Sequence, residues 1–558
     1  MENTEKLPRF SSCRGVSFEI QPSKNSPFSA PPPPPPPEES ELPGQWVWLP
    51  RTSGRSFKVF PLSDSSAAIH RSMSRPSSHF CDLDPDEDPN QTSLDEDIEQ
   101  QAIQVLKKSV NTSLSIEEMR GSNPGGKKRN QSRLSIILFD QGLFTVYKRL
   151  FLLSFSLNTI LLSLAASGRF DYAKRHAALF AMANILILTL SRSEAFLRLL
   201  FSLSVLTLRR LPLPLKTVAT SFLQSIGGIH SGCGISSLAW LTYALIMTIH
   251  HWDEYSEAIV AVASTILALL CLSCLAAFPL LRHLHHNLFE RTHRFAGWSA
   301  LALLWAFVFL TISYNSSNKS YDMRLSRLVK TQEFWFTLSV TFFTVLPWVT
   351  VRRVPVSVSA PSNHASIIKF GGGGVKAGIL GRISRSPLSE WHAFGIISDG
   401  KEGHMMLAGA VGDFTRGLVT DPPSHLWVRQ VHFAGLPYLV NMYNRAVLVA
   451  TGSGICVFLS FLLQPCSADV CLVWVAKGIE ENFGQEILDM VSGFDKERVV
   501  VHDTAVLGRP NVAEMAIEAV KRWKAEVVVV TSNPQGSRDV VEACKGVGIP
   551  AFGPIWDS

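Results

Sequence analysis

The stretch VLVATGSGICVFLSFLL, Val447 to Leu463, joins an apolar run to a glycine-rich turn and then to a second apolar run. The first run is typical of a strand and the second of a helix, which is the context that a dinucleotide-binding loop requires. Gly452 and Gly454 stand in the turn, where glycine allows the backbone to approach a pyrophosphate closely. Such a turn also occurs as plain packing, so both interpretations stay open.

The sequence after this turn keeps alternating between short apolar runs and helical patterns. The apolar runs are VCLVWVA, RVVVHD, EVVVVT and IPAFG, and the helical patterns lie near 455–464, 480–492, 511–524 and 536–546. Continuous apolar strands that alternate with helices indicate a parallel doubly wound sheet. We therefore predict an α/β domain over 441–558.

The preceding segment, 355–440, has a different pattern. Short apolar runs such as SIIKF, EWHAFGIIS, HMMLAGAVG and WVRQVHFAG are separated by glycine-rich turns. Several short strands at this spacing predict a small antiparallel β-barrel.

Long apolar runs fill 145–352, at 149–167, 175–191, 229–250, 257–281, 296–313 and 333–350. Each is long enough to cross about 30 Å of hydrocarbon at about 1.5 Å per residue. We predict a bundle of six transmembrane helices. The stretch 197–214 is also apolar, but its arginines and prolines indicate an interfacial segment rather than a span.

The positive charges of the connecting segments favour one orientation. Lys and Arg gather before the first span, between the second and third, between the fourth and fifth, and after the sixth. That side is predicted to be cytosolic, with both chain termini on it. The sequons at Asn315 and Asn318 fit an outside face for the loop 314–332. A plasma membrane location is our hypothesis.

Two histidines stand at the cytosolic starts of spans that run in the same direction. His230 begins the span 229–250 and His293 precedes the span 296–313. They lie at similar depth, and two neutral imidazoles are axial ligands for a haem iron. The alternative is that both rings are interfacial side chains in contact with headgroups or water. No second pair of histidines lies further along the two spans, so a second stacked haem is not predicted.

Composition agrees with a membrane protein that also has soluble parts. Hydrophobic residues make up 46% and charged residues 18% of the 558 residues, and the net charge of +6 is too small to indicate nucleic acid binding. Residues 1–135 are rich in proline, serine and acidic residues and are predicted to be disordered. The run Pro31 to Pro37 is either a ligand for a proline-motif-binding protein or a solvated spacer.

Four segments then occur in one order: EWHAFGII (Glu390 to Ile397), AVGDFTRGLV (Ala410 to Val419), the glycine-rich turn, and LGRPN (Leu507 to Asn511). Together with the spans, this order resembles the NADPH oxidase and ferric reductase superfamily, and within it the TmpA-like integral membrane flavoproteins. Plant relatives of these are often labelled adenylate-forming or peptide-synthetase-like, but no adenylation domain is visible here. The resemblance implies a ferredoxin-NADP-reductase-like barrel that binds FAD and an α/β domain that binds NAD(P)H.

Residue by residue, the resemblance implies a flavin strand at His392 and Phe394, where Ala393 and Gly395 replace the proline and the hydroxyl of the family motif. Gly412, Thr415 and Gly417 match its Gly-Asp-Trp-Thr-x-Gly turn, whose backbone N–H groups suit a flavin phosphate.

For NAD(P)H the resemblance implies Gly452, Gly454 and Arg509, the last beside an adenosine phosphate. The family's Thr-Pro and Cys-Gly-Pro are replaced here by Cys456-Val457 and Ser532-Asn533-Pro534. Trp556 is implied to stack on the isoalloxazine, with interdomain packing as its alternative.

Two functional hypotheses follow. The first is a membrane flavoprotein oxidoreductase that passes electrons from NAD(P)H through FAD to one inner-leaflet haem, or to an unknown cytosolic acceptor. The second is a catalytically degenerate membrane scaffold or sensor that keeps the reductase fold. The replaced motif residues and the long N-terminal tail favour the second.

Overall fold

The computed structural model describes residues 10–11, 17–18 and 145–555. The N-terminal unit contributes two short strands, β1 (Phe10–Ser11) and β2 (Ser17–Phe18), which pair antiparallel. Most of the predicted disordered tail, including the Pro31 to Pro37 run, lies outside the described residues, and so does Trp556.

The helical region has eleven α-helices among the described residues. They are α3 (Thr145–Ala166), α4 (Asp171–Arg175), α5 (Ala177–Leu190), α6 (Glu194–Leu208), α7 (Leu213–Gln224), α8 (Gly227–His250), α9 (Glu257–Ala276), α10 (Pro279–Leu284), α11 (His286–Ser313), α12 (Leu325–Leu328) and α13 (Gln332–Val349). A short 3₁₀ turn, η2 (Trp252–Glu254), and the strand pair β3 (Tyr314–Asn315) and β4 (Ser320–Tyr321) lie in its loops.

Within 145–555, four helices are long and apolar enough to cross a membrane: α3, α8, α9 and α11. They correspond to four of the six predicted spans. The other two predicted spans correspond to α5 and α13. The fourteen residues of α5 extend about 21 Å, less than the about 30 Å of a hydrocarbon core. Helix α13 has eighteen residues, begins with Gln332 and Glu333, and contains Pro347.

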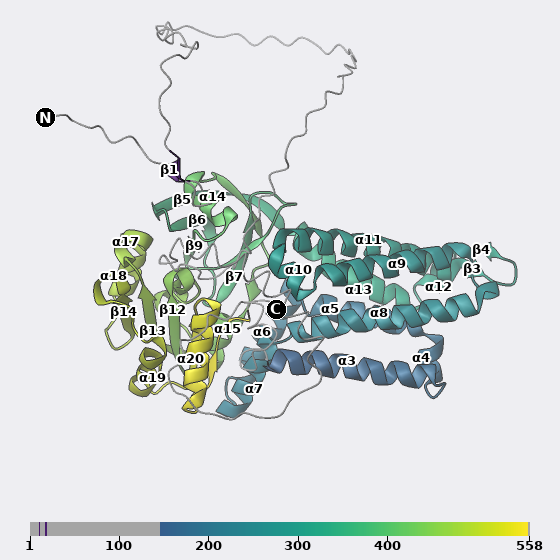
Figure 1. Ribbon diagram of the computed structural model, residues 1–558, viewed down its shortest axis with the longest axis horizontal. Helices are drawn as coiled ribbons and strands as arrows, with labels where there is room; N and C mark the ends of the chain where they lie inside the picture. The colour runs from purple at the N-terminus through teal and green to yellow at the C-terminus, as the bar shows by residue number, and fades with distance from the viewer. Residues whose placement is uncertain (1–9, 12–16, 19–144, 556–558) are drawn as a thin grey trace, which may run out of the picture. The chain divides into compact units, whose positions relative to one another are not determined.

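The long helices pack side by side, with α11 along α9 and with α8 against both α5 and α3 (Figure 1). A polar contact joins three of them inside an otherwise apolar core. The Asn158 side-chain carbonyl accepts hydrogen bonds from Asn184 at 2.8 Å and from the indole of Trp240 at 2.9 Å. Because a buried polar group is costly without a partner, this contact fixes how α3, α5 and α8 meet.

The strand region begins directly after α13, with β5 (Val351–Ser362), β6 (Ala365–Gly373), β7 (Ile379–Ser384), β8 (His392–Gly395) and β9 (Glu402–Gly409). It continues with α14 (Asp413–Thr420), β10 (His425–Arg429) and β11 (Phe433–Ala434). The antiparallel order is β11-β7-β10-β5-β6-β9, and β8 pairs with β7.

The stretch EWHAFGII brings this sheet close to a closed barrel. Strand β8 pairs with β7, and Ile397 then forms a bridge with Met405 of β9 through two hydrogen bonds of 2.8 Å. Strand β8 and the residues after it therefore lie between β7 and the end strand β9. This arrangement supports the predicted small antiparallel barrel.

The C-terminal region starts with α15 (Leu436–Leu439) and η3 (Val440–Met442) and then forms a five-stranded parallel sheet. Its strands are β12 (Arg445–Thr451), β13 (Asp469–Ala476), β14 (Val499–Asp503), β15 (Val527–Thr531) and β16 (Ala551–Phe552), in the order β14-β13-β12-β15-β16. The connecting elements are η4 (Gly452–Val457), α16 (Ser460–Leu463), α17 (Ile479–Ser492), α18 (Thr504–Leu507), α19 (Val512–Trp523) and α20 (Pro534–Gly546).

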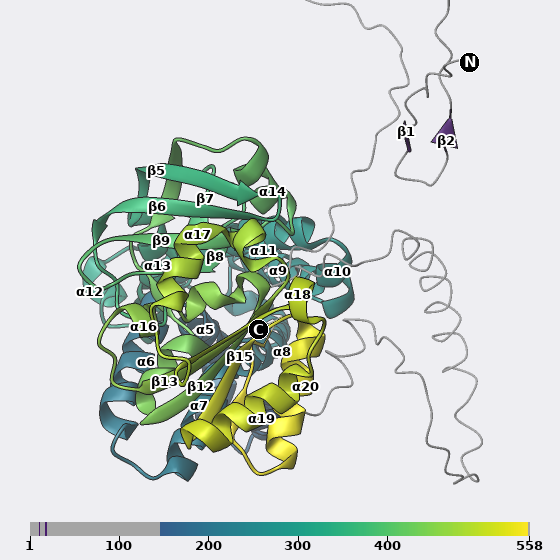
Figure 2. The same cartoon turned by 90° about the vertical axis from the view of Figure 1, so that its left-hand side faces the viewer.

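Both faces of this sheet are buried. Alternate strand residues such as Val447 and Val449 pack under α19 and α20, whereas Leu448 and Ala450 belong to a core shared with the barrel and with α6 and α7. Figure 2 shows α19 and α20 along one side of the parallel strands. Burial on two faces is why these strands are apolar without alternation.

Candidate functional site

The two predicted haem ligands lie beside each other. The ring centroids of His230 on α8 and His293 on α11 are 6.4 Å apart, with the ring planes inclined by 57°. Two imidazoles that ligate one metal ion from opposite sides have ring centres about 6 Å apart, because each metal–nitrogen bond is about 2 Å long. The separation of these rings therefore matches a shared metal ion.

Each ring is held through its Nδ1 atom. Nδ1 of His230 lies 3.0 Å from the carbonyl oxygen of Leu188, and Nδ1 of His293 lies 2.7 Å from Oγ and 3.3 Å from the carbonyl oxygen of Ser273. Since a carbonyl oxygen only accepts, these contacts favour an Nδ1–H donor and leave the Nε2 lone pair for a ligand. Metal-bound histidines are commonly oriented in this way.

A positive charge that the sequence analysis missed lies next to the histidines. Arg192, in the turn between α5 and α6, and Arg282 on α10 both act electrostatically on the two imidazoles. Burial among protein atoms lowers the pKa of Arg192 to about 10, although its side chain keeps solvent-accessible area. Within the described residues its side chain has no hydrogen bond or ion pair.

On the barrel, the predicted flavin residues form an aromatic cluster. His392 is buried and stacks on Phe414 with ring centroids 4.0 Å apart and planes inclined by 15°. Phe394, also buried, lies 6.4 Å from the same Phe414 ring. Phe414 is the first aromatic residue of α14, so the cluster joins the strand motif to the turn motif.

The turn motif is largely engaged within the protein. The Gly412 N–H donates to Thr415 Oγ1 at 3.0 Å, and that hydroxyl donates back to the Gly412 carbonyl at 3.1 Å. The Gly417 carbonyl accepts a hydrogen bond of 2.7 Å from Arg385, which also pairs with Asp421. The motif thus begins the eight-residue helix α14, and Gly417 lies close to the Arg385 guanidinium.

The glycine-rich turn follows β12 as predicted, but a regular helix does not come next. Gly452 has a φ of +52°, and its carbonyl accepts a hydrogen bond of 2.9 Å from the Trp474 indole. Gly454 is buried. The chain then passes through the six-residue 3₁₀ turn η4 and the four-residue α16 instead of the predicted helix at 455–464. No long helix N-terminus therefore faces this turn.

The barrel and the glycine-rich turn touch each other directly. A Cβ placed on Gly395 would lie 2.7 Å from Cα and 2.8 Å from N of Val457, so only glycine fits at that position. The neighbouring Cys456 is fully enclosed, and burial raises the pKa of its thiol to about 12. Gly395 and Cys456-Val457 are three of the positions at which this sequence departs from the family motifs.

The remaining predicted nucleotide residues are at the ends of parallel strands or next to them. Arg509 lies between α18 and α19, after Gly508, whose φ is +73°. Asn511 accepts from the Glu514 N–H at 3.4 Å and so caps α19. In Ser532-Asn533-Pro534, the Ser532 hydroxyl contacts Thr451 at 2.7 Å, which joins the first and fourth strands at their carboxyl ends.

A buried ion pair links the helices to the barrel, and the sequence analysis missed it as well. Glu194, at the start of α6, pairs with Arg382 of β7 and, at 2.9 Å, with Arg429 of β10. The Arg429 guanidinium also lies 4.8 Å from the ring of Trp391 and 5.5 Å from that of Trp348. The only sequence feature that could have indicated this ion pair is Glu194 itself, a single acidic residue between two apolar runs.

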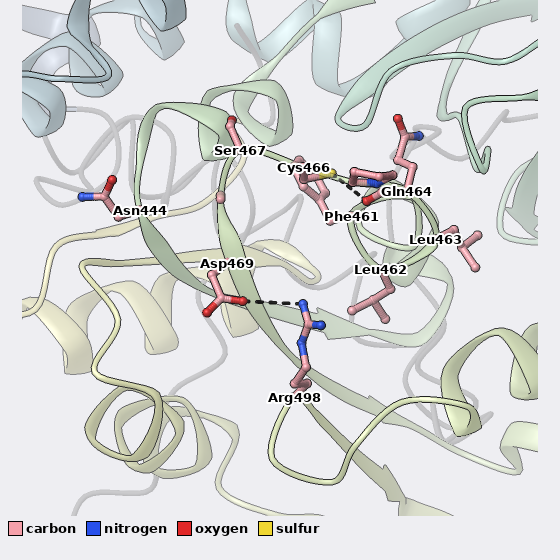
Figure 3. Close-up of a pocket in the computed structure, with 11 residues that line it drawn as sticks. Asn444, Phe461, Leu462, Leu463, Gln464, Cys466, Ser467, Asp469 and Arg498 are labelled. Carbon is pink, nitrogen blue, oxygen red and sulfur yellow. Dashed lines mark hydrogen bonds and ion pairs between the residues drawn. The ribbon is translucent and has the colours of Figure 1, made fainter.

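A pocket of about 530 Å³ lies near the amino ends of the parallel strands, lined by Asn444, Asp469, Arg498 and the segment 461–468 (Figure 3). Asp469 and Arg498 form an ion pair of 3.6 Å across it. Gly452 and Ser532 are at the opposite, carboxyl ends of the strands. This pocket is therefore separate from the predicted nucleotide site.

Comparison with known proteins gives a family model that matches the C-terminal region and two relatives that match a longer stretch. Residues 436–558 match the family model described as "Adenylate-forming reductase 03009, C-terminal domain". The chain is 36% identical over 444 residues to adenylate-forming reductase 03009 of Coprinopsis cinerea, covering 77% of this chain and 42% of the relative. It is 35% identical over 429 residues to adenylate-forming reductase 06235 of the same fungus, covering 75% of this chain and 40% of the relative. The chain thus spans about two fifths of the length of these relatives.

Among solved structures, a ferredoxin reductase in carbazole 1,9a-dioxygenase is 12% identical with a TM-score of 0.28, covering 36% of this chain and 67% of that one. A ferredoxin-NADP+ reductase from Plasmodium falciparum is 11% identical, also with a TM-score of 0.28, covering 35% of this chain and 90% of that one. Scores this low do not establish a shared fold, so the description of the barrel and the parallel sheet rests on this chain's own strands.

Proposed function

We propose that this protein is a membrane oxidoreductase that holds one haem between His230 and His293, with FAD bound by the barrel and NAD(P)H by the parallel sheet. The observation that carries the proposal is the geometry of the histidine pair. The rings are 6.4 Å apart, and each Nδ1 is hydrogen-bonded so that Nε2 is left as a ligand. The names of the two relatives, both reductases, are in keeping with this chemistry.

The surroundings of the two histidines suit a haem. His230 and His293 would hold the haem iron, and Arg192 and Arg282 would stabilise negatively charged groups of the haem. When bound, FAD would accept a hydride from NAD(P)H and the haem would take electrons one at a time. The protein's own contribution is to fix both imidazoles in one tautomer and to keep a cation beside them.

For the flavin, His392, Phe394 and Phe414 supply an aromatic wall, and the first turn of α14 after Gly412 supplies backbone N–H groups for a phosphate. Thr415 holds that turn closed on itself, and Gly417 lies against Arg385. For the nucleotide, the carboxyl ends of β12 and β15 carry Gly452, Gly454 and the Thr451–Ser532 contact. Arg509 follows β14 and α18 and would contribute from that side of the sheet.

We propose that the protein is an integral membrane protein. The four long apolar helices would cross the bilayer in contact with lipid, with α5 and α13 completing six spans and both chain termini in the cytosol. The plasma membrane is the cellular location that we propose. The electron acceptor other than haem is a cytosolic molecule of unknown identity.

The test uses the full chain purified in detergent, with anaerobic addition of NADH or NADPH. A Soret band that shifts on addition of the nucleotide is expected. His230→Ala should remove the band, whereas His251→Ala, an exposed histidine just beyond the far end of α8, should leave it unchanged. A folded protein with no Soret band, or a band that survives in His230→Ala, would overturn the proposal.

A second candidate is a membrane scaffold or sensor that keeps the reductase fold without its chemistry. One observation favours it: the end of β8 and the glycine-rich turn are in backbone contact at Gly395 and Val457, where the resemblance places the meeting point of two cofactors. A colourless protein that also fails to bind FAD and NAD(P)H in calorimetry would support this function instead.

A further inference from the structure

Helix α6 is apolar on two opposite faces. Leu197, Phe201 and Leu208 pack into the core shared by the barrel and the parallel sheet. Leu199, Leu203 and Leu206 follow a spacing of four and three residues and are exposed. At about 100° per residue these two stripes point in opposite directions. Helix α6 is therefore covered by protein on one face and exposes leucines on the opposite face.

Helix α7 repeats the arrangement. Lys216, Thr220 and Leu223 are buried, whereas Leu215, Val218 and Phe222 are exposed. The two helices follow each other in the chain, separated by residues 209–212, and each exposes an apolar face. We call residues 194–224 the α6–α7 segment and these six exposed side chains, Leu199, Leu203, Leu206, Leu215, Val218 and Phe222, its outer face.

The inner face is bound firmly to the reductase-like region. Thr220 Oγ1 and the Tyr443 hydroxyl are 2.7 Å apart, and Lys216 pairs with Glu526 at 3.8 Å. Arg198 donates to the His432 carbonyl at 3.2 Å, and Arg209 donates to the Ser467 carbonyl, also at 3.2 Å. The α6–α7 segment therefore moves together with the barrel and the sheet.

The outer face has the same character as the surfaces of the long apolar helices. Leu206 is 76% exposed, comparable with Leu153 on α3, which is 65% exposed. The α6–α7 segment lies between α5 and α8 in the chain, and α7 contacts α3 (Figure 1). In that view α7 runs across the direction of α3, as a helix parallel to a membrane surface does beside one that spans it.

The charges at the turn between the two helices fit a headgroup layer. Arg209 and Arg210 are both exposed and stand at the end of α6. Arginines beside an apolar helical face are typical of segments that lie at a bilayer surface and are attracted to anionic lipids.

We propose that the outer face of the α6–α7 segment lies in the bilayer interface and binds anionic lipid, so that this segment seats the barrel and the parallel sheet on the membrane. The occupant is lipid rather than a protein partner, because the outer face is continuous in the chain with helices of the same surface character. This inference rests on the proposed membrane location but does not depend on haem, FAD or NAD(P)H.

The test places an environment-sensitive NBD label at Leu206→Cys, and separately at Val218→Cys, in the full chain. Val506→Cys on α18 is the matched control, because Val506 is 79% exposed and stands on the parallel-sheet region. The labelled proteins are reconstituted in phosphatidylcholine vesicles with phosphatidylserine, with the unsubstituted chain as the background for native cysteines. Quenching by a lipid-attached doxyl group is compared with quenching by iodide in the water.

We expect doxyl quenching at positions 206 and 218 to exceed that at 506 several-fold, with the opposite order for iodide. Lowering the phosphatidylserine content should raise iodide quenching at both outer-face positions. The proposal is overturned if positions 206 and 218 are as open to iodide as 506. It is also overturned if both quenchers are excluded, which would indicate a protein contact. Because no redox cofactor enters the measurement, its failure is distinct from failure of the proposed function.

Discussion

Two regions of this protein were expected to hold cofactors, and they differ in what they leave available. Around His230 and His293, each Nδ1 is bound and each Nε2 is left, with Arg192 nearby. Where the barrel meets the parallel sheet, backbone lies against backbone at Gly395 and Val457. The comparison teaches that two predicted sites in one chain can differ in kind: the histidine region leaves ring nitrogens available for a ligand, whereas the contact between the barrel and the parallel sheet is filled by packing.

The buried ion pair of Glu194 with Arg382 and Arg429, which joins α6 to the barrel, is expected to have the largest effect on stability. Glu194→Gln removes the negative charge that Arg382 and Arg429 share in a buried place. Loss of one partner of a buried ion pair costs about 3 kcal/mol, since the remaining charges are left uncompensated. Thermal unfolding of the full chain in detergent measures it. Asp421→Asn, in an ion pair whose Asp side chain is 83% exposed, is the control and should change little. Equal shifts in the two variants would contradict the link.

The contact between the barrel and the parallel sheet can be disrupted at Gly395. Gly395→Ala places a methyl group 2.7 Å from the Val457 backbone, which has to move. Overpacking of this kind costs about 2 kcal/mol. Gly371→Ala on β6 is the matched control, because a Cβ there meets nothing within 4 Å. If the Gly395 variant melts at the same temperature as the Gly371 variant, the two parts do not meet as described.

The histidine region can be sharpened at Ser273. Ser273→Ala removes the hydroxyl at 2.7 Å from His293 Nδ1 but leaves the carbonyl oxygen at 3.3 Å. Loss of such a supporting hydrogen bond lowers metal affinity by about ten-fold. Haem titration of the purified protein measures the change. Ser264→Ala, on the same helix and bonded only to Val260, should bind haem as the unsubstituted chain does. A tighter complex in the Ser273 variant would refute this role.

The smallest effect concerns pH and the barrel. Burial lowers the pKa of His432 to about 4, and the nearby charges of His404 and Arg198 contribute in the same direction. The carboxylate of Glu194 raises this pKa, but by less. The unfolded chain, whose histidine pKa is about 6.5, binds more protons between these values, so stability is lost as pH falls from about 6.5 towards about 4.

His432→Gln should therefore reduce the difference in stability between pH 7 and pH 6 by about 0.7 kcal/mol. Thermal melts at the two pH values measure it, with the exposed His425→Gln as the control. A pH difference that is unchanged in the His432 variant would show that this ring does not contribute.

Much of the fold could be predicted from local sequence pattern. The short runs over 355–440 and the alternation of strands and helices after Val447 predicted an antiparallel sheet followed by a parallel one, because period and turn residues are local properties. The order of the strands within each sheet was not predicted. The span 229–250 differs from α8 by two residues. The prediction of a regular helix after the glycine-rich turn was wrong. Residues 452–463 are apolar on all sides and form the 3₁₀ turn η4 and the short helix α16 within the core.

Of the candidate site, only the proximity of the two histidines could be predicted. His230 and His293 were paired by the direction and depth of two spans. The Glu194–Arg429 pair joins residues 235 positions apart, and the Phe414 stack on His392 depends on how α14 packs on β8. Such contacts arise from tertiary packing and leave no periodic signal in the chain. The roles of the barrel and sheet residues stay predictions.

The haem content of the purified full chain tests the central claim most directly. A pyridine haemochrome assay against protein concentration should give one haem per chain, falling to background in His293→Ala and staying at one in His251→Ala. A folded chain with no haem, or one whose haem content is unaffected by His293→Ala, would contradict the claim that these two imidazoles form a ligand pair.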